Sequence, residues 1–401
     1  MSAVAKGAPV SAVAKGASVV IVGAGVTGLS AAFWLARDGV DVLVLDKGVV
    51  GYEASSRNGG GCTHYQSPLF HEEQRLWPRM DELLGYPTEW RGERIVIAVT
   101  EAQLARYHRI QGIVGELGYR VDLLDPRQVR DAVPLAGANL GGVHIRTGGQ
   151  ANPQRTVQAY AWAAQDHGAR ILQHTPALGI AMAGGRAVGV RTAAGVIGCD
   201  QLVIAAGPQS DRLARDAGLD LPLAPARAEM IVTEAQPPMP LGGVDGNGLY
   251  GRQTLRGNLA YGGGWHEWLD AVPADNPLPR PSTPTIRPLA RRLAELFPKA
   301  AHARVIRSWA GIVENTPDGR PVLDRPADPG NVTVATMSSV GFGLSPATGR
   351  ALRDIVVEGR CTFADLGKLS LARFRDLDPD WRRRQGWFTP AAAPAREEMP
   401  A

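Results

Sequence analysis

Residues 18–46 read SVVIVGAGVTGLSAAFWLARDGVDVLVLD, and this stretch decides the fold of the chain. Residues 18–23 (SVVIVG) are a short β-branched apolar run that ends in glycine, which is typical of a buried parallel strand. Residues 27–38 carry apolar side chains at helical spacing, and residues 41–45 (DVLVL) predict a second buried strand. The stretch therefore predicts a βαβ unit.

A Gly-x-Gly-x-x-Gly motif joins the first predicted strand to the helix, in the context that a dinucleotide-binding loop requires. Gly23 permits the tight turn, Gly25 lets the backbone approach a pyrophosphate, and Gly28 lets helix and strand pack closely. The helix start at Val26 and Thr27 offers free N–H groups and the positive end of the helix dipole to the anion. We therefore expect a phosphate site here.

Asp46 stands at the end of the second predicted strand, directly before Lys47. A carboxylate at this place accepts hydrogen bonds from the adenosine ribose hydroxyls and repels a 2′-phosphate. A coincidental glycine-rich turn with a surface aspartate is the alternative, but strand, glycines, helix and acid all fall at the required spacing. Asp46 and Lys47 are thus predicted to bind a dinucleotide, and this motif alone does not distinguish NAD from FAD.

A second glycine-rich stretch follows at residues 51–61 (GYEASSRNGGG). Together with the first motif, it resembles the D-amino acid oxidase-like superfamily of flavoenzymes, which includes glycine oxidase, sarcosine oxidase, D-amino acid dehydrogenase and hydrogen cyanide synthase subunits. The resemblance implies that a Ser-x-x-Asn-Gly-Gly segment runs along the FAD pyrophosphate to the flavin ring, with backbone meeting the ring. The FAD site is then predicted to include Ser56, Arg57, Asn58, Gly59 and Gly60.

Four later stretches extend this resemblance over most of residues 18–360. They are residues 149–153 (GQANP) with the helix that follows, 203–207 (VIAAG), the glycine-containing hairpin of 252–264, and 309–319 (WAGIVENTPDG). The resemblance implies that the backbone approaches the cofactor at Ala206 and Gly207, and that residues 309–319, with Gly311, cross back to the flavin.

Residues 341–347 (GFGLSPA) precede a predicted helix at 346–358, with Ser345 as N-cap and Pro346 in the first turn. The resemblance aims this helix start at the flavin, where its positive end would stabilise the anionic reduced flavin. An ordinary capped helix is the alternative. On the flavin interpretation, the residues that join the FAD site are Gly341, Gly343, Leu344 and Ser345.

Tyr250 and Arg252 on the predicted hairpin, and His266 after its glycines, are the candidate catalytic side chains. A tyrosine hydroxyl and a guanidinium suit a carboxylate substrate, although a surface or interdomain ion pair is the alternative for Arg252. Cys62 and His64 also follow the glycine-rich loop, and for these two residues and His266 a structural role is favoured over a catalytic one.

The crossing segment at residues 312–314 (IVE) lacks the arginine that clamps the substrate carboxylate in glycine oxidase and D-amino acid oxidase. Either Arg252 therefore holds a substrate carboxylate from the other side, or the substrate is an amine without one. Residues 258–262 (NLAYG) also lack the lysine that activates O₂ in sarcosine oxidases, which favours a dehydrogenase unless Arg256 or His266 supplies the charge.

The predicted fold class is α/β, with a Rossmann-like FAD-binding domain and an inserted antiparallel-sheet substrate domain. Alternation within residues 219–232, 247–252 and 257–262 predicts the antiparallel sheet. The expected boundaries are a flexible N-terminal arm at 1–17, a discontinuous FAD-binding domain of 18–85, 150–215 and 310–380, a substrate domain of 86–149 and 216–309, and a C-terminal tail at 381–401.

Composition excludes several classes of protein. The 401 residues carry 44% apolar and 20% charged side chains, as in packed globular chains, and a formal net charge of only +4. The arginines are scattered among acids, so nucleic-acid binding is not indicated. The three cysteines are far apart and odd in number, which predicts no disulfide framework, no metal site and a reducing cytoplasm. No apolar run approaches the ~20 residues of a membrane span.

The predicted activity is FAD-dependent oxidation of a C–N bond in an amino acid or secondary amine, by hydride transfer to flavin N5, with hydrolysis of the imine. The flavin is expected to be non-covalent, because Gly311 stands seven residues before Asp318, where monomeric sarcosine oxidases carry a flavin-linking cysteine. Expected partners are O₂ or another electron acceptor, and a homo- or hetero-oligomer. The alternatives are a D-amino acid dehydrogenase or oxidase, a flavoprotein subunit of an amine dehydrogenase, and an NAD-dependent dehydrogenase.

Overall fold

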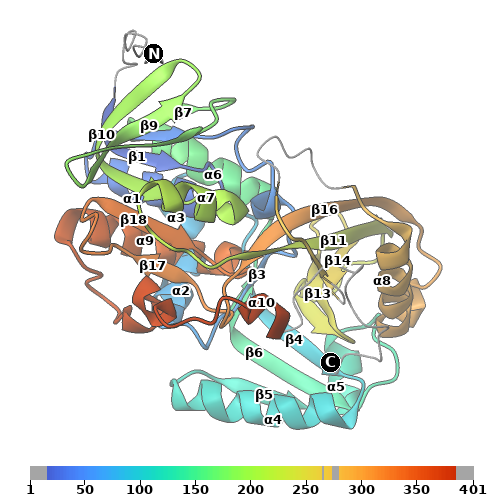
Figure 1. The fold of residues 1–401 in the computed structure, drawn as a ribbon. Helices are drawn as coiled ribbons and strands as arrows, with labels where there is room; N and C mark the ends of the chain where they lie inside the picture. Colours follow the sequence, from blue (N-terminus) through green and yellow to red (C-terminus); the bar gives the residue numbers. More distant parts are fainter. Residues whose placement is uncertain (1–15, 264–265, 273–279, 385–401) are drawn as a thin grey trace.

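The computed structural model describes residues 16–263, 266–272 and 280–384, which form two sheets with helices around them (Figure 1). The predicted mixed α/β class is therefore confirmed. The predicted N-terminal arm lies outside the described residues except for residues 16 and 17, and Ala17 already belongs to the first strand.

The first sheet is parallel at its centre, in the order β17-β18-β10-β1-β2-β7. Its strands in the described residues are β1 (Ala17–Val22), β2 (Val42–Leu45), β7 (Arg170–Leu172), β8 (Gly179–Ala183), β9 (Arg186–Thr192), β10 (Gly195–Ile204), β17 (Val322–Asp324) and β18 (Val332–Thr336). Val22, Leu45 and Ile204 lie side by side at the carboxyl ends of β1, β2 and β10. The loops that leave these three strands therefore meet at one edge, where open α/β sheets bind ligands.

Three helices cover one face of the first sheet and share its main apolar core. They are α1 (Val26–Arg37), α6 (Pro153–Asp166) and α9 (Gly341–Glu358). Asn152 caps α6 by accepting hydrogen bonds from the N–H groups of Gln154 and Arg155, and Pro153 occupies its first position. The helix α7 (Ser210–Asp216) packs near β8, β10 and β18 in a second core.

The second sheet is mainly antiparallel and contains ten strands of the described residues. They are β3 (Gly61–Cys62), β4 (Arg91–Ala98), β5 (Val121–Leu124), β6 (Gly141–Gln150), β11 (Ala224–Ala235), β12 (Val244–Gly246), β13 (Leu249–Gln253), β14 (Asn258–Gly263), β15 (Glu267–Trp268) and β16 (Val305–Asn315). The alternating segments of the sequence thus pair as predicted, with β11 against β14 and β13 against β14.

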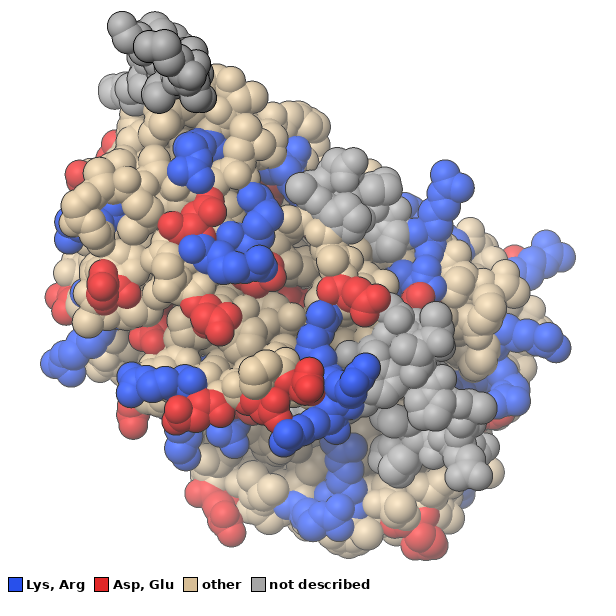
Figure 2. Space-filling model, viewed as in Figure 1, with Lys and Arg blue, Asp and Glu red and all other residues tan. Residues whose placement is uncertain are grey.

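The remaining helices lie around the two sheets. They are α2 (Phe70–Leu76), α3 (Met80–Leu84), α4 (Glu101–Glu116), α5 (Pro126–Ala132), α8 (Thr283–Leu296) and α10 (Trp381–Arg384). Of these, α2 and α3 add Leu76, Met80 and Leu84 to the main core of the first sheet. Among the helices that the structure describes, none has the length and apolar character of a membrane-spanning segment. Figure 2 shows positive and negative side chains interspersed over the face it presents.

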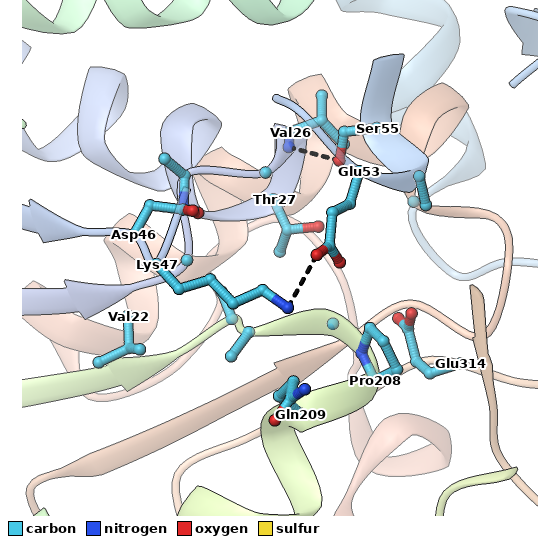
Figure 3. Close-up of a pocket in the computed structure, with 18 of the residues that line it drawn as sticks. Val22, Val26, Thr27, Asp46, Lys47, Glu53, Ser55, Pro208, Gln209 and Glu314 are labelled. Carbon is cyan, nitrogen blue, oxygen red and sulfur yellow. Dashed lines mark hydrogen bonds and ion pairs between the residues drawn. The ribbon is translucent and has the colours of Figure 1, made fainter. Parts of the chain in front are cut away.

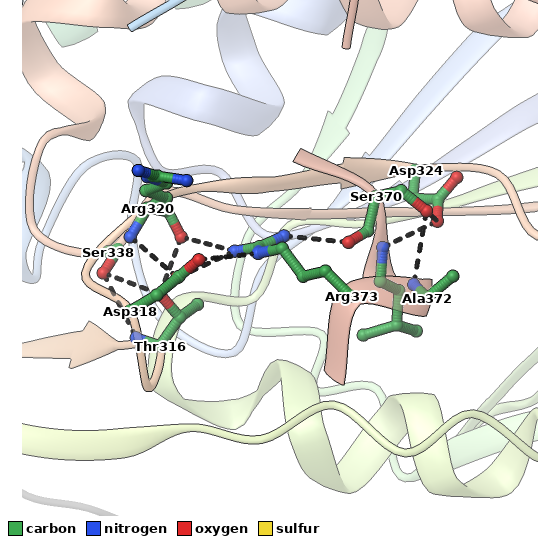
Figure 4. Close-up of polar contacts among 9 residues, drawn as sticks. Thr316, Asp318, Arg320, Asp324, Ser338, Ser370, Ala372 and Arg373 are labelled. Carbon is green, nitrogen blue, oxygen red and sulfur yellow. Dashed lines mark hydrogen bonds and ion pairs between the residues drawn. The ribbon is translucent and has the colours of Figure 1, made fainter. Parts of the chain in front are cut away.

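Residues 316–324, which follow β16, are hydrogen-bonded to residues 370–373 near the C-terminus (Figure 4). Arg373 donates to both carboxylate oxygens of Asp318, at 2.9 and 3.1 Å, and to the carbonyl of Arg320. Ser370 donates to Asp324 at 2.8 Å. These bonds hold residues 370–373 against the turn that follows β16 and against β17.

The start of α9 differs from the prediction, since the helix begins at Gly341 rather than near Pro346. Ser345 is not an N-cap; it lies in the second turn, fully buried, and its carbonyl accepts a hydrogen bond from the Ser30 hydroxyl. Packing of α9 against α1 is the physical reason, because burial of this turn outweighs the backbone bond that Pro346 cannot donate.

The sheets also divide the chain slightly differently from the expected domains. β3 and the part of β16 from residue 310 on hydrogen-bond into the second sheet, although both fell within the predicted FAD-binding domain. The predicted C-terminal tail begins with the short helix α10, where Arg382 donates to the carbonyls of Leu269 and Asp270, and residues 385–401 lie outside the described part. The domain boundaries themselves stay a prediction.

Candidate functional site

A cavity of about 600 Å³ opens at the carboxyl ends of β1, β2 and β10 (Figure 3). Its walls come from the glycine loop before α1, the segment after β2, the turn after β10, the crossing strand β16 and the start of α9. These segments are far apart in the sequence. The cavity has the size and place of a ligand site in an open α/β sheet.

The glycine loop shows why each of its three glycines is needed. Gly23 has φ +113°, and a Cβ added there would lie 2.2 Å from the carbonyl oxygen of Ala205. A Cβ on Gly28 would lie 2.0 Å from the carbonyl oxygen of Gly23. A Cβ on Gly25 would meet only the Ser55 hydroxyl, at 3.0 Å, and would otherwise point into open space beside the cavity. Gly23 and Gly28 are therefore required by close backbone packing, whereas the missing side chain of Gly25 leaves space for a bound ligand.

Asp46 lines the cavity and uses both carboxylate oxygens to shape it. Oδ2 accepts the N–H of Ala24 and Oδ1 accepts the N–H of Gly48, each at 2.7 Å. Burial raises the pKa of Asp46 and these two bonds oppose the rise. Each oxygen keeps a lone pair for a further donor, so the carboxylate can still accept from ribose hydroxyls.

Lys47 and Glu53 form an ion pair of 2.8 Å on the wall of the cavity, as Figure 3 shows. The Ser55 hydroxyl accepts the N–H of Val26 at 2.9 Å, at the positive end of α1. Glu53 and Ser55 were not predicted as site residues, although both stand in the glycine-rich stretch of residues 51–61. Their two contacts join that stretch to β2 and to α1.

Ten of the predicted cofactor residues line the cavity. They are Gly23, Gly25, Val26, Thr27, Asp46, Lys47, Asn58, Ala206, Gly207 and Gly341. Asn58 shapes the loop around it, because its amide donates to the carbonyls of Ala54 and Ser55 and accepts the N–H of Gly60.

Nine predicted residues do not line the cavity. They are Gly28, Ser56, Arg57, Gly59, Gly60, Gly311, Gly343, Leu344 and Ser345. Arg57 fastens the crossing strand instead, since its Nη1 donates to the carbonyl of Ala310 and its own carbonyl accepts the indole N–H of Trp309. Their predicted contacts with the cofactor therefore stay a prediction.

Glu314 on β16 lines the cavity. It was not predicted as a site residue; the sequence indicated only that its segment lacks the carboxylate-binding arginine of glycine oxidase. Its Oε1 accepts the hydroxyl of Thr336 and the N–H of Met337, at 3.1 and 3.0 Å. Its Oε2 lies 3.8 Å from the place of a Cβ on Gly207, at the cavity wall. Burial raises the pKa of Glu314, which favours the neutral acid. Residues 176–178 also line the cavity, and no sequence motif marks them.

The end of the glycine-rich loop lies against the second sheet. A Cβ on Gly59 would meet the ring of Tyr250 at 3.0 Å, and the Nη1 of Arg252 donates to the carbonyl of Gly59 at 3.0 Å. Arg252 is 8% exposed, and burial lowers its pKa to about 10. Burial also raises the pKa of Tyr250 to about 12. The fold thus brings two of the three candidate catalytic residues to this loop.

The third candidate, His266, immediately precedes β15, whose two residues pair with Ala226 and Arg227 of β11. It is half-buried, and burial lowers its pKa. It does not line the cavity. Cys62 is buried, its thiol donates to the carbonyl of Gly60 at 3.3 Å, and burial raises its pKa, so the unreactive thiol form is favoured.

The fold and the cavity together define a dinucleotide-binding α/β protein. The cradle around Gly25, the open lone pairs of Asp46 and the helix start at Val26 fit the pyrophosphate and adenosine of such a cofactor. Within the described residues, no cluster of three or more histidine, cysteine or acidic side chains offers a metal site.

Comparison with known proteins places the chain in one family. Residues 18–355 match the family described as FAD dependent oxidoreductase, and the chain belongs to this family. It is an enzyme whose cofactor is FAD, as predicted. The NAD-dependent alternative accounts for only the first fifty residues of the chain, whereas the family match extends to residue 355.

The chain is also similar to individual proteins over most of their length. The chain is 28% identical to sarcosine oxidase subunit beta of Rhodobacter capsulatus, with 88% of each chain covered. The structure of glycine oxidase from Geobacillus kaustophilus superposes with a TM-score of 0.81 at 27% identity, covering 90% of this chain and 99% of that one. L-proline dehydrogenase from P. horikoshii shares the fold, with a TM-score of 0.82 at 22% identity over 90% and 98% of the two chains.

Proposed function

We propose that this chain oxidises the C–N bond of an amino acid or a secondary amine that carries a carboxylate, and that Arg252 binds the carboxylate. Bound FAD supplies the two-electron acceptor for the hydride that leaves the carbon bearing nitrogen, and the resulting imine hydrolyses. The names of the relatives support the substrate class, because sarcosine and glycine are both amino acids.

The observation that carries this proposal is the buried guanidinium of Arg252. Within the described residues no carboxylate lies within 4 Å of it, and its one hydrogen bond to protein is to the carbonyl of Gly59. Arg94 nearby offers the contrast, since it is equally buried and paired with Asp245 at 2.5 Å. The charge of Glu89 acts on Arg252 only from beyond contact distance, and Glu89 is itself bound to Arg155 and Asn152. A buried cation without a carboxylate in direct contact is costly, so a substrate carboxylate would complete the site.

The position of Arg252 also suits the chemistry. Its bond to Gly59 places the guanidinium on the loop that runs on from the cavity, and Tyr250 lies against the same glycine. A carboxylate held there by a two-pronged arginine contact would fix the substrate beside this loop. The hydroxyl of Tyr250 keeps its proton because burial raises its pKa, so it can donate to the same carboxylate.

The test compares an amino acid with its decarboxylated amine in Arg252→Gln and wild-type enzyme. Glutamine ends two bonds short of Nη1 and loses the bond to Gly59; the amine analogue reports the effect of that loss by itself, because it has no carboxylate. We expect Arg252→Gln to weaken the amino acid by about 2–5 kcal/mol, roughly 30-fold or more in kcat/KM, as for removal of one partner of a buried charge pair. The amine analogue should change little. Equal small effects on both compounds would exclude Arg252 as the carboxylate anchor.

We also propose that the chain works as one subunit of a larger assembly. The support is its similarity, over 88% of both chains, to a protein named as a subunit. The size of the native protein, isolated without a tag from its own cells, tests this. A particle heavier than the 42.6 kDa chain that contains a second polypeptide is expected, and a monomer with full amine-oxidising activity would contradict it.

A further inference from the structure

We propose that Glu314 is a further cofactor-binding residue, and that its carboxyl oxygen Oε2 hydrogen-bonds a hydroxyl of the ribityl chain of FAD. The ribityl chain is the hydroxyl-bearing segment that joins the pyrophosphate to the flavin ring. The inference rests on FAD as the cofactor of the family to which the chain belongs, and it is independent of the proposed substrate and of Arg252.

Glu314 differs from the other acids of the cavity in its hydrogen bonds. Three acidic residues line the cavity in the described part of the chain. Asp46 accepts a backbone N–H at each carboxylate oxygen, and Glu53 forms an ion pair. The Oε1 of Glu314 accepts from Thr336 and Met337, whereas no hydrogen bond joins its Oε2 to another described residue. Figure 3 shows the carboxyl end of Glu314 directed toward the interior of the pocket.

The bonds of Oε1 determine what Oε2 can offer to a ligand. Two donors at Oε1 use both of its lone pairs. Burial raises the pKa of Glu314, and within the described ranges no lysine or arginine forms an ion pair with it, so the neutral acid is favoured. Its proton then lies on Oε2, which can donate into the cavity. A hydroxyl is a suitable partner, because it accepts such a bond without carrying a charge.

The strand order places Glu314 beyond the pyrophosphate. The strands run in the order β2-β1-β10-β18, about 4.8 Å apart. Asp46 follows β2 and Gly25 follows β1, so adenosine and pyrophosphate belong to these two strand ends. The Oε2 of Glu314 lies 3.8 Å from the place of a Cβ on Gly207, which follows β10, and Oε1 binds Met337, which follows β18. Because FAD is an elongated molecule, the segment that reaches these next two strand ends is the ribityl chain.

The loop that Glu314 binds is held in a backbone conformation that non-glycine residues rarely adopt. Ser338 and Ser339 have φ +47° and +68°, and such residues persist where surrounding bonds hold them. The two residues after Glu314 supply these bonds. Asn315 accepts the hydroxyl of Ser339 at 2.8 Å, and the N–H of Thr316 donates to the hydroxyl of Ser338 at 3.1 Å. The carboxyl group is therefore held in place before the cofactor binds, which lowers the entropy cost of the contact.

The experiment compares FAD with ADP, which contains the adenosine and the pyrophosphate but lacks the ribityl chain. Both are titrated into FAD-free protein, FAD by fluorescence and ADP by calorimetry. Glu314→Met keeps the length of the side chain and removes its hydrogen bonds. We expect this variant to raise the Kd of FAD about 3- to 10-fold, as for one lost hydrogen bond, and to leave the Kd of ADP within about 2-fold.

Glu314→Gln is the conservative variant. Its amide oxygen can accept from Thr336 and Met337, and its NH₂ group stands where Oε2 stood and can donate to the same hydroxyl. We expect it to bind FAD within about 2-fold of the wild type. Asp46→Ala is the contrasting control, because it removes the acceptor for the adenosine ribose and should weaken ADP and FAD by the same factor.

A second ligand tests the hydroxyl directly. An FAD analogue with a hydroxyl-free alkyl chain in place of the ribityl chain should bind the wild type more weakly than FAD does, and Glu314→Met should discriminate less between the two. Thermal unfolding of the FAD-free variants verifies that each is folded.

Unchanged FAD affinity in Glu314→Met overturns the proposal. An equal loss for ADP and FAD in this variant also overturns it, because the contact would then lie at the pyrophosphate or the effect would be a general one on the site. A loss in Glu314→Gln as large as in Glu314→Met would contradict donation from Oε2 and overturn the proposal as stated. No amine substrate is used, so failure of the proposed function would be seen separately.

Discussion

Gly25→Val separates cofactor binding from folding at the glycine loop. Gly25 adopts φ −77° and ψ 175°, a conformation open to any residue, and an added Cβ meets only the Ser55 hydroxyl at 3.0 Å. The valine should therefore leave the FAD-free protein nearly as stable as the wild type, within about 1 kcal/mol. The rest of the side chain enters the space beside the cavity where the pyrophosphate must approach.

The expected loss is in the affinity of the protein for FAD. Forcing extra methyl groups into an occupied contact costs about 1–3 kcal/mol, which corresponds to roughly 5- to 150-fold weaker binding. Gly28→Val is the contrasting variant, because its Cβ would lie 2.0 Å from the carbonyl oxygen of Gly23, a backbone atom that cannot move aside. We expect Gly28→Val to lose stability with or without FAD, by more than the whole effect of Gly25→Val on binding.

The assay is fluorescence titration of FAD-free protein with FAD, alongside chemical unfolding of the same preparations. Gly25→Val should show a raised dissociation constant for FAD with an unchanged unfolding midpoint in the absence of FAD. If Gly25→Val purified with full FAD occupancy and bound FAD as tightly as the wild type, the pyrophosphate would not lie at Gly25 and the site would be wrongly assigned.

Three further predictions follow from other parts of the site. Acid precipitation should release the yellow colour into the supernatant, because Gly311 has no thiol and Cys62 is a buried thiol with a raised pKa; colour in the pellet would point to Cys62 as an anchor. Reduced enzyme should reoxidise slowly in air, since Arg256 lies in the exposed turn between β13 and β14 and burial lowers the pKa of His266; rapid reoxidation that survives changes at both residues would contradict this. Glu314→Gln should gain stability relative to wild type as pH rises. Folding raises the pKa of Glu314, so its contribution is full below the ordinary carboxyl pKa and is lost as pH rises through the raised value. Unfolding of FAD-free protein at pH 4.5 and 8 measures the unfolding free energy of Glu314→Gln minus that of wild type, and a value that stays constant or falls between these two pH values would refute the prediction.

Local patterns in the sequence were sufficient for the first βαβ unit and its loop. Strand period, helical spacing and the three glycines are properties of contiguous residues, so β1, α1 and β2 appear within one or two residues of their predicted bounds. The antiparallel pairing of β11, β13 and β14 was predicted for the same reason. The start of α9 was missed because Ser345 and Pro346 carry the local pattern of a helix start, and packing against α1 overrides it.

What the sequence by itself determined is the class of fold, the dinucleotide loop and, through its ordered motifs, the flavoenzyme family. Only the tertiary structure decided which side chains share a wall of the site. Glu53 and Glu314 lie more than 250 positions apart, yet both line one cavity, and Arg252 of β13 meets Gly59 in the loop before β3. The burial of Arg252 without a carboxylate in direct contact is a property of its surroundings that no local pattern encodes, because it depends on which distant segments exclude water from the guanidinium.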